Sequence, residues 1–159
     1  MNKRALVQKI LDHLSAELAL YQKAARAAHA EATHEQSKAE NKYDTRGLEA
    51  SYLARGQSRQ AAEIVQAIEQ FKKLPLKNYS PNDAIDLGAI VELQGKAERS
   101  FYFIGPRAGG TEILHEKKEV LVITPPSPLG QQLVRKKQGD RLQIEIGGRQ
   151  NVYSVVSVS

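Results

Sequence analysis

Several residue types that often decide a protein's chemistry are absent or rare in this chain of 159 residues. It contains no cysteine and no tryptophan, and phenylalanine occurs only three times. The lack of cysteine excludes disulfide bonds, thiol catalysis and cysteine-ligated zinc or iron–sulfur sites. It is also compatible with a reducing cytoplasm.

Long apolar runs are absent as well. No stretch approaches the roughly 20 apolar residues needed to cross a bilayer, and the N-terminus leads into an amphipathic pattern and not into an apolar signal core. The net charge of +5 and the pI near 9.4 are mildly basic, which favours an acidic partner but is far from the composition of a dedicated nucleic-acid binder. We therefore expect a cytoplasmic protein without membrane contact.

The first 37 residues contain neither proline nor glycine and are rich in strong helix formers. Apolar residues recur there at alternating steps of three and four, the spacing of a coiled-coil seam. We expect one helix over residues 2–37, roughly 50 Å long at about 1.5 Å per residue. A helix of that length needs a partner to cover its narrow apolar stripe. The seam consists of Val7, Leu11, Leu14, Leu18, Tyr21, Ala25, Ala28 and Ala32.

A second helix with the same rhythm supplies that partner. It begins near Asp44 or Thr45, either of which can cap it, and it ends before Pro75, because the residue ahead of a proline disfavours helix. A parallel dimeric coiled coil is the rival arrangement, but the matched lengths of the two seams favour a hairpin within a monomer. The second seam consists of Ala50, Ala54, Gln57, Ala61, Ile64, Ile68 and Phe71.

The predicted hairpin occupies residues 1–74 and narrows towards its turn. Its seam residues shrink from Leu, Ile and Phe at the base to alanine near the turn, and the pairs centre on Asn41. The turn itself, residues 38–44 (the tip), is polar and carries two carboxylates, Glu40 and Asp44. The pattern therefore predicts a thin projection with a charged end.

The composition changes after the hairpin. Residues 75–84 contain two prolines and turn-forming residues and are expected to form a linker. Residues 85–159 are expected to form a small antiparallel sheet, so the chain as a whole is α+β. At about 75 residues this core is marginal, which predicts packing against the linker or the hairpin base. The expected strands are 89–93, 100–104, 120–124, 142–146 and 152–158.

Two connections in this second domain have clear signals. Ser127 followed by Pro128 marks a capped helix start, and the helix is expected to run to about Arg135. Residues 105–110 are glycine-rich but lack the Lys-Ser/Thr of a phosphate loop, so a hairpin turn is the simplest interpretation.

The segment 121–133, together with Lys137-Gln138-Gly139-Asp140-Arg141-Leu142 and the later Tyr153, resembles the C-terminal domain of the bacterial Gre transcription elongation factors. Glu40-Asn41 followed by Tyr43 is similar to a Gre hairpin tip. The resemblance implies an FKBP-like C-terminal domain after an N-terminal coiled coil. It further implies a transcription regulator that binds bacterial RNA polymerase and inserts its tip into the secondary channel, with DNA binding among its expected properties. The implied polymerase-binding candidates are Ser127, Pro128, Leu129 and Gly130.

The resemblance also implies how the tip takes part in chemistry. Cleavage-stimulating Gre factors carry an Asp-x-x-Glu pair that helps hold a second catalytic Mg²⁺ in the polymerase, which itself cleaves the RNA. Here Ser37 stands where the aspartate is expected, and a hydroxyl is a poorer Mg²⁺ ligand than a carboxylate. Glu40 and Asp44 are the possible Mg²⁺-assisting pair, although Asp44 is equally suited to capping the second helix. We expect no stably held metal or cofactor and no catalytic residues of its own.

The remaining candidate site residues are basic side chains, which could contact nucleic acid, and histidines, which could bind a metal. Contact with nascent RNA or acidic channel walls is one interpretation of the basic residues near the tip, and a solvated helix face is the other. The cluster at residues 135–137 suits nucleic acid or an acidic rim, but is equally expected at a helix C-terminus. The four histidines show no metal-ligand spacing and are expected at the surface. The basic candidates near the tip are Lys42, Arg46, Arg55 and Arg59, and the histidines are His13, His29, His34 and His115.

Two other functions fit the same domains. An FKBP-like domain would suit a prolyl isomerase or chaperone module, although three phenylalanines and no tryptophan are poor material for its aromatic pocket. A coiled-coil adaptor without a polymerase role is the third interpretation.

Overall fold

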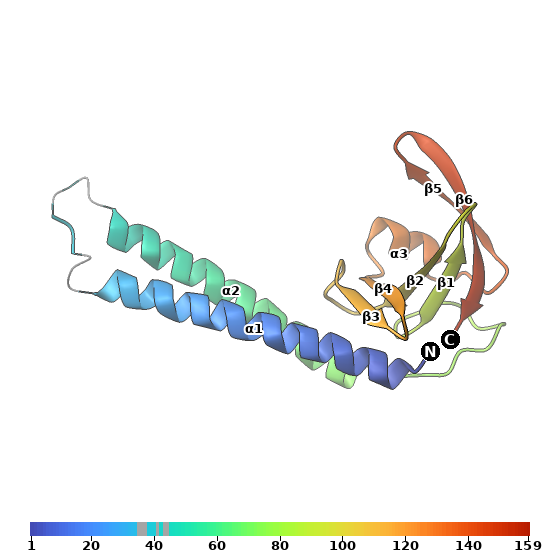
Figure 1. Ribbon diagram of the computed structural model, residues 1–159, viewed down its shortest axis with the longest axis horizontal. Coiled ribbons are helices and arrows are strands. Elements are labelled where there is room, and N and C mark those ends of the chain that lie inside the picture. Colours follow the sequence, from blue (N-terminus) through green and yellow to red (C-terminus); the bar gives the residue numbers. More distant parts are fainter. Residues whose placement is uncertain (35–37, 41, 43–44) are drawn as a thin grey trace. The chain divides into compact units, whose positions relative to one another are not determined.

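The computed structural model describes residues 1–34, 38–40, 42 and 45–159. Two long helices precede a six-stranded sheet that carries one short helix, so the predicted α+β class is confirmed (Figure 1). Within the described residues, no helix is both long and apolar enough to span a membrane. The elements are α1 (Lys3–Thr33), α2 (Arg46–Lys73), β1 (Ile90–Gln94), β2 (Arg99–Ile104), β3 (Glu112–His115), β4 (Lys118–Ile123), α3 (Pro128–Leu133), β5 (Arg141–Ile146) and β6 (Arg149–Val158).

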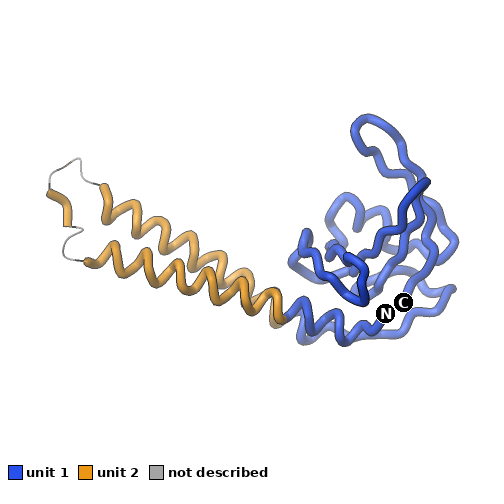
Figure 2. The backbone as a smooth tube through the Cα atoms, viewed as in Figure 1, with its two compact units in different colours: residues 1–11, 70–159 blue, residues 12–69 orange. Residues whose placement is uncertain are grey.

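The contacts divide the chain into two compact units (Figure 2). Unit 1 comprises Met1–Leu11 and Gln70–Ser159, and unit 2 comprises Asp12–Glu69. The contacts thus group the bases of both helices with the sheet. The boundaries predicted at 74 and 85 follow a change in composition along the chain instead.

Unit 2 is an antiparallel pair formed by the outer parts of α1 and α2 (Figure 1). Its buried seam carries Leu14 and Ile64 towards the base and Ala28 and Ala50 towards the far end. The predicted gradient from large to small seam residues is therefore confirmed. Thr45 directly precedes α2, and its hydroxyl donates to Oε1 of Glu49 at 3.0 Å. Of the predicted end of the first helix, residues 35–37 lie outside the described residues.

The strand order of the sheet is β3-β4-β2-β1-β6-β5. Four of the neighbouring pairs are antiparallel as predicted, whereas β2 and β4 run parallel. The reason is the short strand β3, which the sequence did not indicate because only two of its four residues are apolar. It pairs antiparallel with β4 through a tight turn at Glu116 and Lys117, both at positive φ. Residues 105–110 consequently lead from β2 to β3, and the predicted hairpin turn there is wrong.

One face of the sheet is covered within unit 1 by the base of α2. Phe71 is 1% exposed, and its ring stacks on that of Phe103 with the centroids 6.3 Å apart. Gly105 leaves room for this contact, since a Cβ there would lie 3.0 Å from Cζ of Phe71 and 2.8 Å from Cγ1 of Val122. The expected packing of the sheet against the hairpin base is thus confirmed.

One histidine lies on this covered face, and its expected position at the surface is wrong. His115 is 3% exposed, because side chains alternate along β3 and His115 shares the buried side with Ile113.

The opposite face of the sheet holds a second core. Its fully or nearly buried members are Ile85, Ala89, Val91, Leu93, Ile104, Ile123, Leu133, Leu142, Val155 and Val158.

The turn between β3 and β4 is bound to the start of α1. The backbone N–H of Asn2 donates to Oε1 of Glu116 at 3.0 Å, and Nζ of Lys9 donates to the carbonyl of Leu114 at 2.9 Å. Oδ1 of Asn2 in turn accepts from the N–H of Ala5, which caps the helix. The N–H of Asn2 therefore holds the pKa of the Glu116 carboxyl below its usual value.

Replacing Phe71 by alanine tests the first of these contacts. Phe71→Ala should lower the free energy of unfolding by about 3–5 kcal/mol, because the truncation leaves a cavity between α2 and the sheet. Tyr52→Ala, at an exposed site of the same helix, is the matched control and should change it by no more than about 0.5 kcal/mol. Urea unfolding followed by circular dichroism measures both, and equal losses in the two variants would contradict the assigned role.

The Glu116 contact predicts a dependence on pH. Because the folded pKa of Glu116 lies below its unfolded pKa, its stabilising contribution is present above the unfolded value and is lost as the pH falls through the folded value. The stability advantage of wild type over Glu116→Gln should therefore shrink as the pH is lowered from 7 to 3. Unfolding curves at several pH values measure the difference, and an advantage that stayed constant would exclude the ionised contact.

Candidate functional site

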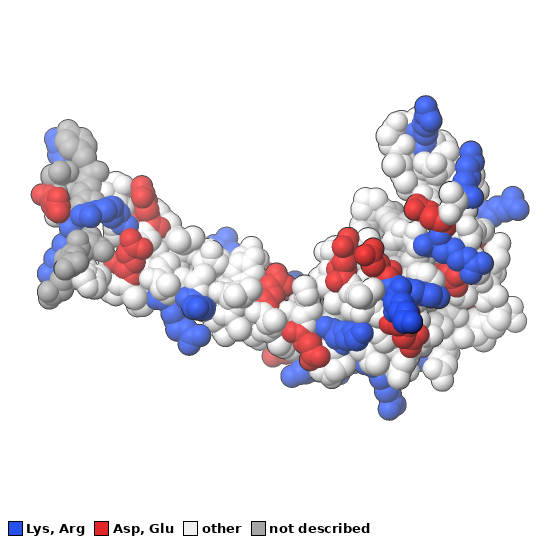
Figure 3. Space-filling model, viewed as in Figure 1, with Lys and Arg blue, Asp and Glu red and all other residues white. Residues whose placement is uncertain are grey.

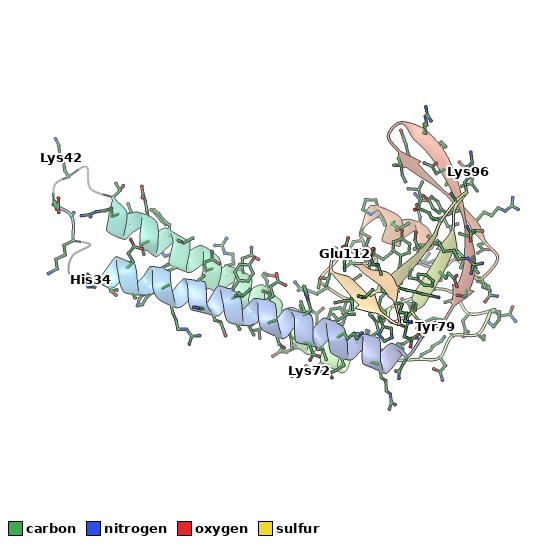
Figure 4. The ribbon with its side chains drawn as sticks, in the orientation of Figure 1. His34, Lys42, Lys72, Tyr79, Lys96 and Glu112 are labelled. Atoms are coloured by element: carbon green, nitrogen blue, oxygen red, sulfur yellow. The ribbon has the colours of Figure 1, made fainter. Side chains whose placement is uncertain are left out.

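The described part of the tip comprises Lys38–Glu40 and Lys42. The Glu40 side chain is 78% exposed, and its Oε1 lies 3.6 Å from Nη2 of Arg46 in the first turn of α2. Lys42 is likewise exposed, and Figure 4 shows it at the end of the helical pair. Ser37 and Asp44 lie outside the described residues, so the predicted Glu40–Asp44 pair stays a prediction.

The histidine and carboxylate side chains of the described residues do not come together as a metal site. Across residues 1–34, 38–40, 42 and 45–159, no group of three or more histidine and carboxylate side chains could hold a metal ion. At the tip, the described residues contribute the single carboxylate of Glu40, and it is paired with Arg46. Mg²⁺ requires six oxygen ligands in near-octahedral geometry. The described tip could therefore complete a Mg²⁺ site only with ligands from elsewhere.

A shallow groove of about 660 Å³ runs along unit 2, and we call it the helical groove. Its floor is formed by small residues of the seam and its neighbours, because alanine and serine let the two helices approach closely. Arginines from both helices stand at its sides, and the guanidinium of Arg55 also lies 5.9 Å from the ring centroid of Tyr52. The lining consists of Ala25, Arg26, His29, Ala30, Ser51, Ala54, Arg55, Ser58 and Arg59.

The helical groove brings together two of the four predicted basic residues, Arg55 and Arg59. It adds Arg26, which the sequence reasoning missed although this residue lies between Ala25 and Ala28 of the predicted first seam. Arg46 is outside the groove lining and pairs with Glu40 instead. Both signs of charge are interspersed along the visible face of the helical pair (Figure 3).

The four polymerase-binding candidates form the start of α3 in unit 1. Oγ of Ser127 accepts from the N–H of Gly130 at 3.1 Å and donates to the carbonyl of Thr124 at 2.7 Å, so this side chain serves as the predicted N-cap. Pro128 occupies the first helical turn and is exposed, whereas Leu129 packs against the core. Pro128 is thus the member of the set that presents an open surface.

Gly130 has a structural role at this turn. It is buried, and a Cβ added to it would overlap the carbonyl oxygen of Thr124 and come within 2.8 Å of Oγ of Ser127. The close approach of α3 to the end of β4 therefore requires a residue without a side chain. A polymerase contact by Gly130 itself stays a prediction.

Replacing Gly130 by alanine tests whether this position requires a residue without a side chain. Gly130→Ala should lower the free energy of unfolding by at least about 2 kcal/mol, because the overlap forces the helix start away from Thr124. Gly56→Ala is the matched control, since a Cβ at that helical position meets nothing within 4 Å. It should raise stability by roughly 0.5–1 kcal/mol. Thermal melts distinguish the variants, and a neutral Gly130→Ala would refute the packing argument.

No protein-family profile and no curated protein sequence matches the chain. Among solved structures, GreA factor homolog 1 (Gfh1) of Thermus thermophilus matches with 21% identity and a TM-score of 0.39, covering 94% of both chains. Gfh1 of Thermus aquaticus matches with 21% identity and a TM-score of 0.41, covering 92% of both chains. The GreA/GreB elongation factor of Nitrosomonas europaea matches with 16% identity and a TM-score of 0.38, covering 70% of this chain and 92% of that one. The matching structures are thus of the Gre type that the sequence motifs indicated.

Proposed function

We propose that this protein is a Gre-like transcription factor that binds bacterial RNA polymerase and inserts the tip of its helical pair into the secondary channel. The observation that carries the proposal is the graded seam of unit 2. Leu14 and Ile64 are buried towards the base, and Ala28 and Ala50 are buried towards the tip. A pair with this seam narrows towards the tip, because alanine side chains let two helices approach more closely than leucine and isoleucine do.

The dimensions and the surface of the helical pair suit insertion into a solvated passage. The part of α1 that belongs to unit 2, residues 12–33, is about 33 Å long at 1.5 Å per residue. Its surface carries interspersed charges of both signs, and arginines line the helical groove. Such a surface remains hydrated and can contact anionic groups along its path.

The tip itself determines what insertion does. A single carboxylate, Glu40, would occupy the channel and compete with other channel-binding factors without supplying a full acidic pair. Together with Asp44 it would offer the polymerase's catalytic Mg²⁺ two carboxylates, which is the arrangement that supports transcript cleavage. In both cases the nucleolytic centre belongs to the polymerase.

The isomerase alternative has less support. Phe71 and Phe103 stack on each other in the core, and the ring of Phe101 is covered by Nζ of Lys118 at 4.3 Å from its centroid. These three are all the phenylalanines of the chain. Phe71 and Phe103 are therefore engaged in the core, and Phe101 lines a surface groove whose other lining residues are mostly charged or polar, unlike the aromatic pocket that a peptidyl proline needs.

Transcript cleavage in a backtracked elongation complex tests the proposal. Polymerase binding of the wild type, Glu40→Ala and Asp44→Ala should agree within about twofold, because the candidate polymerase-binding residues lie at the start of α3 and not at the tip. Ser37→Asp should raise the cleavage rate at least about tenfold, since a carboxylate is a better Mg²⁺ ligand than a hydroxyl. Glu31→Ala removes an exposed carboxylate from α1 and is the matched control.

The outcomes separate binding from chemistry. Loss of wild-type cleavage in both Glu40→Ala and Asp44→Ala would establish the acidic pair. Cleavage that appears only with Ser37→Asp would establish a channel binder without that chemistry. Absence of any measurable binding between the wild type and the polymerase would refute the proposal.

A further inference from the structure

Two lysine side chains, from Lys3 and Lys77, meet at one aromatic ring in unit 1, and we call them the lysine pair. Nζ of Lys3 lies 4.8 Å from the ring centroid of Tyr79, and Nζ of Lys77 lies at the same distance from that centroid. Nζ of Lys3 also donates to the carbonyl of Lys77 at 2.7 Å. The hydroxyl of Tyr79 donates to the carbonyl of Leu87 at 2.9 Å, which holds the ring beside the start of α1 (Figure 4).

The two ammonium groups of the lysine pair are not equivalent. Nζ of Lys77 has a carboxylate partner, because Oδ1 of Asp83 lies 3.7 Å away, whereas Lys3 is partly buried against the ring and the carbonyl. Burial and the positive charge of Lys77 lower the pKa of Lys3 to about 8. With such a pKa, on the order of a fifth of the Lys3 amines are neutral at about pH 7.5, against about one in a thousand for an ordinary lysine. A neutral amine is a nucleophile, and an ammonium group is not.

The groups on the neighbouring segments leave this proton exchange to Lys3. Burial raises the pKa of Tyr79, and hydrogen bonds from backbone N–H groups lower the pKa values of Asp83 and Glu116, so these three side chains keep their charge state at neutral pH. Lys3 is the one among the shifted groups that changes its charge there. The charged and titratable groups around the start of α1 are Arg4 on α1, Lys77, Tyr79, Asp83 and Asp86 on the segment before β1, and Glu116 between β3 and β4.

Lys3 also lines a recess of about 390 Å³. Arg4, Asn2 and Asn78 contribute a guanidinium group and two side-chain amides to the lining, together with the apolar Leu76. These donors suit an oxyanion, and a carboxylate would satisfy them as well as a phosphate does. The amine of Lys3 narrows the choice, because it reacts only with a ligand that also carries an electrophilic carbon and a leaving group.

An acyl phosphate combines an oxyanion and an electrophilic carbon in one small molecule. The neutral Nζ of Lys3 attacks the carbonyl carbon and forms the new C–N bond. The bond between that carbon and the phosphate oxygen breaks, its electron pair leaves with the phosphate, and the proton that the nitrogen loses is taken up by the released phosphate. A coenzyme A thioester is a poorer match, since its nucleotide and long arm are large for a recess near the lower end of the usual range for ligand pockets.

We propose that Lys3 is a modification site, at which a small acyl phosphate transfers its acyl group to Nζ. The product is an uncharged amide, so the modification removes one of the two positive charges at the ring of Tyr79. The residues of this site belong to unit 1, whereas the tip belongs to unit 2. The inference consequently stands without the proposed channel insertion.

Acetylation of the full-length protein by acetyl phosphate tests this inference, with peptide mass spectrometry following each lysine separately. Lys3 should react about tenfold faster than Lys23, an exposed lysine of the same helix, because its larger fraction of neutral amine outweighs the lower nucleophilicity of a weaker base. The rate at Lys3 should also level off as the pH rises past about 8, where most of its amine is already neutral. Equal rates at Lys3 and Lys23 would overturn the proposal.

Two variants test the lysine pair and the recess separately. Lys77→Gln removes the charge that helps to lower the pKa of Lys3, and it should slow acetylation of Lys3 about threefold. Lys96→Gln removes a charge from the turn between β1 and β2 (Figure 4) and is the matched control, with a change of less than about 1.5-fold. Arg4→Gln should slow the reaction with acetyl phosphate about fivefold. It should leave the reaction with the uncharged acetic N-hydroxysuccinimide ester nearly unchanged.

The variants keep the proposal falsifiable because Arg4 and Lys77 are exposed, so both variants should melt at the temperature of the wild type. Equal slowing in Lys77→Gln and Lys96→Gln would show that the lysine pair does not activate Lys3, and it would overturn the assignment. An Arg4→Gln variant that reacts like the wild type, or that loses the same factor with both reagents, would refute the recess as the binding site of the acyl phosphate.

Discussion

The stacking of Phe71 on Phe103 is the contact on which the arrangement of unit 1 depends. It holds the base of α2 against the sheet, at the point where Gly105 leaves room for the ring. The start of α1 is bound to the same sheet through the N–H of Asn2 and the carboxylate of Glu116. A sheet of this size has a marginal core by itself. The helix bases supply the missing cover, so the first residues of α1 and the last residues of α2 belong to the same compact unit as the sheet.

The graded seam of unit 2 follows a simple rule of packing. Large side chains such as Leu14 and Ile64 give burial where the pair begins, and alanines such as Ala28 and Ala50 give close approach farther out. The alanine part of the seam stabilises the pair less than the leucine part, because an alanine contact buries less apolar surface than a leucine contact. The proposed role in a narrow channel accounts for that choice, and the small residues leave the helical groove, with its arginines, between the two helices.

The sequence predicted those features that local spacing determines. The two long helices follow from the periodicity of apolar residues, and the cap at Ser127 follows from the Ser-Pro pair at the start of α3. The helices and the cap are confirmed. Strand β3 was missed because it is short and half polar, and the parallel pairing of β2 with β4 depends on it. The left-handed backbone of Arg135 could not be predicted from the sequence either. Hydrogen bonds at Ile85, 50 residues earlier in the chain, hold this conformation. The predicted acidic pair of Glu40 and Asp44 stays a prediction, because Asp44 lies outside the described residues.

The strand order has a consequence for the behaviour of the protein at high concentration. β5 stands at the end of the sheet, and the row of backbone groups on its outer side is a template onto which another chain could add. Arg141 and Glu145 alternate with apolar residues along this strand, and charged side chains on an edge oppose such strand addition. The charge of Arg141 therefore opposes aggregation at this edge. A variant without this charge should add strands of neighbouring molecules to its sheet more readily at high concentration.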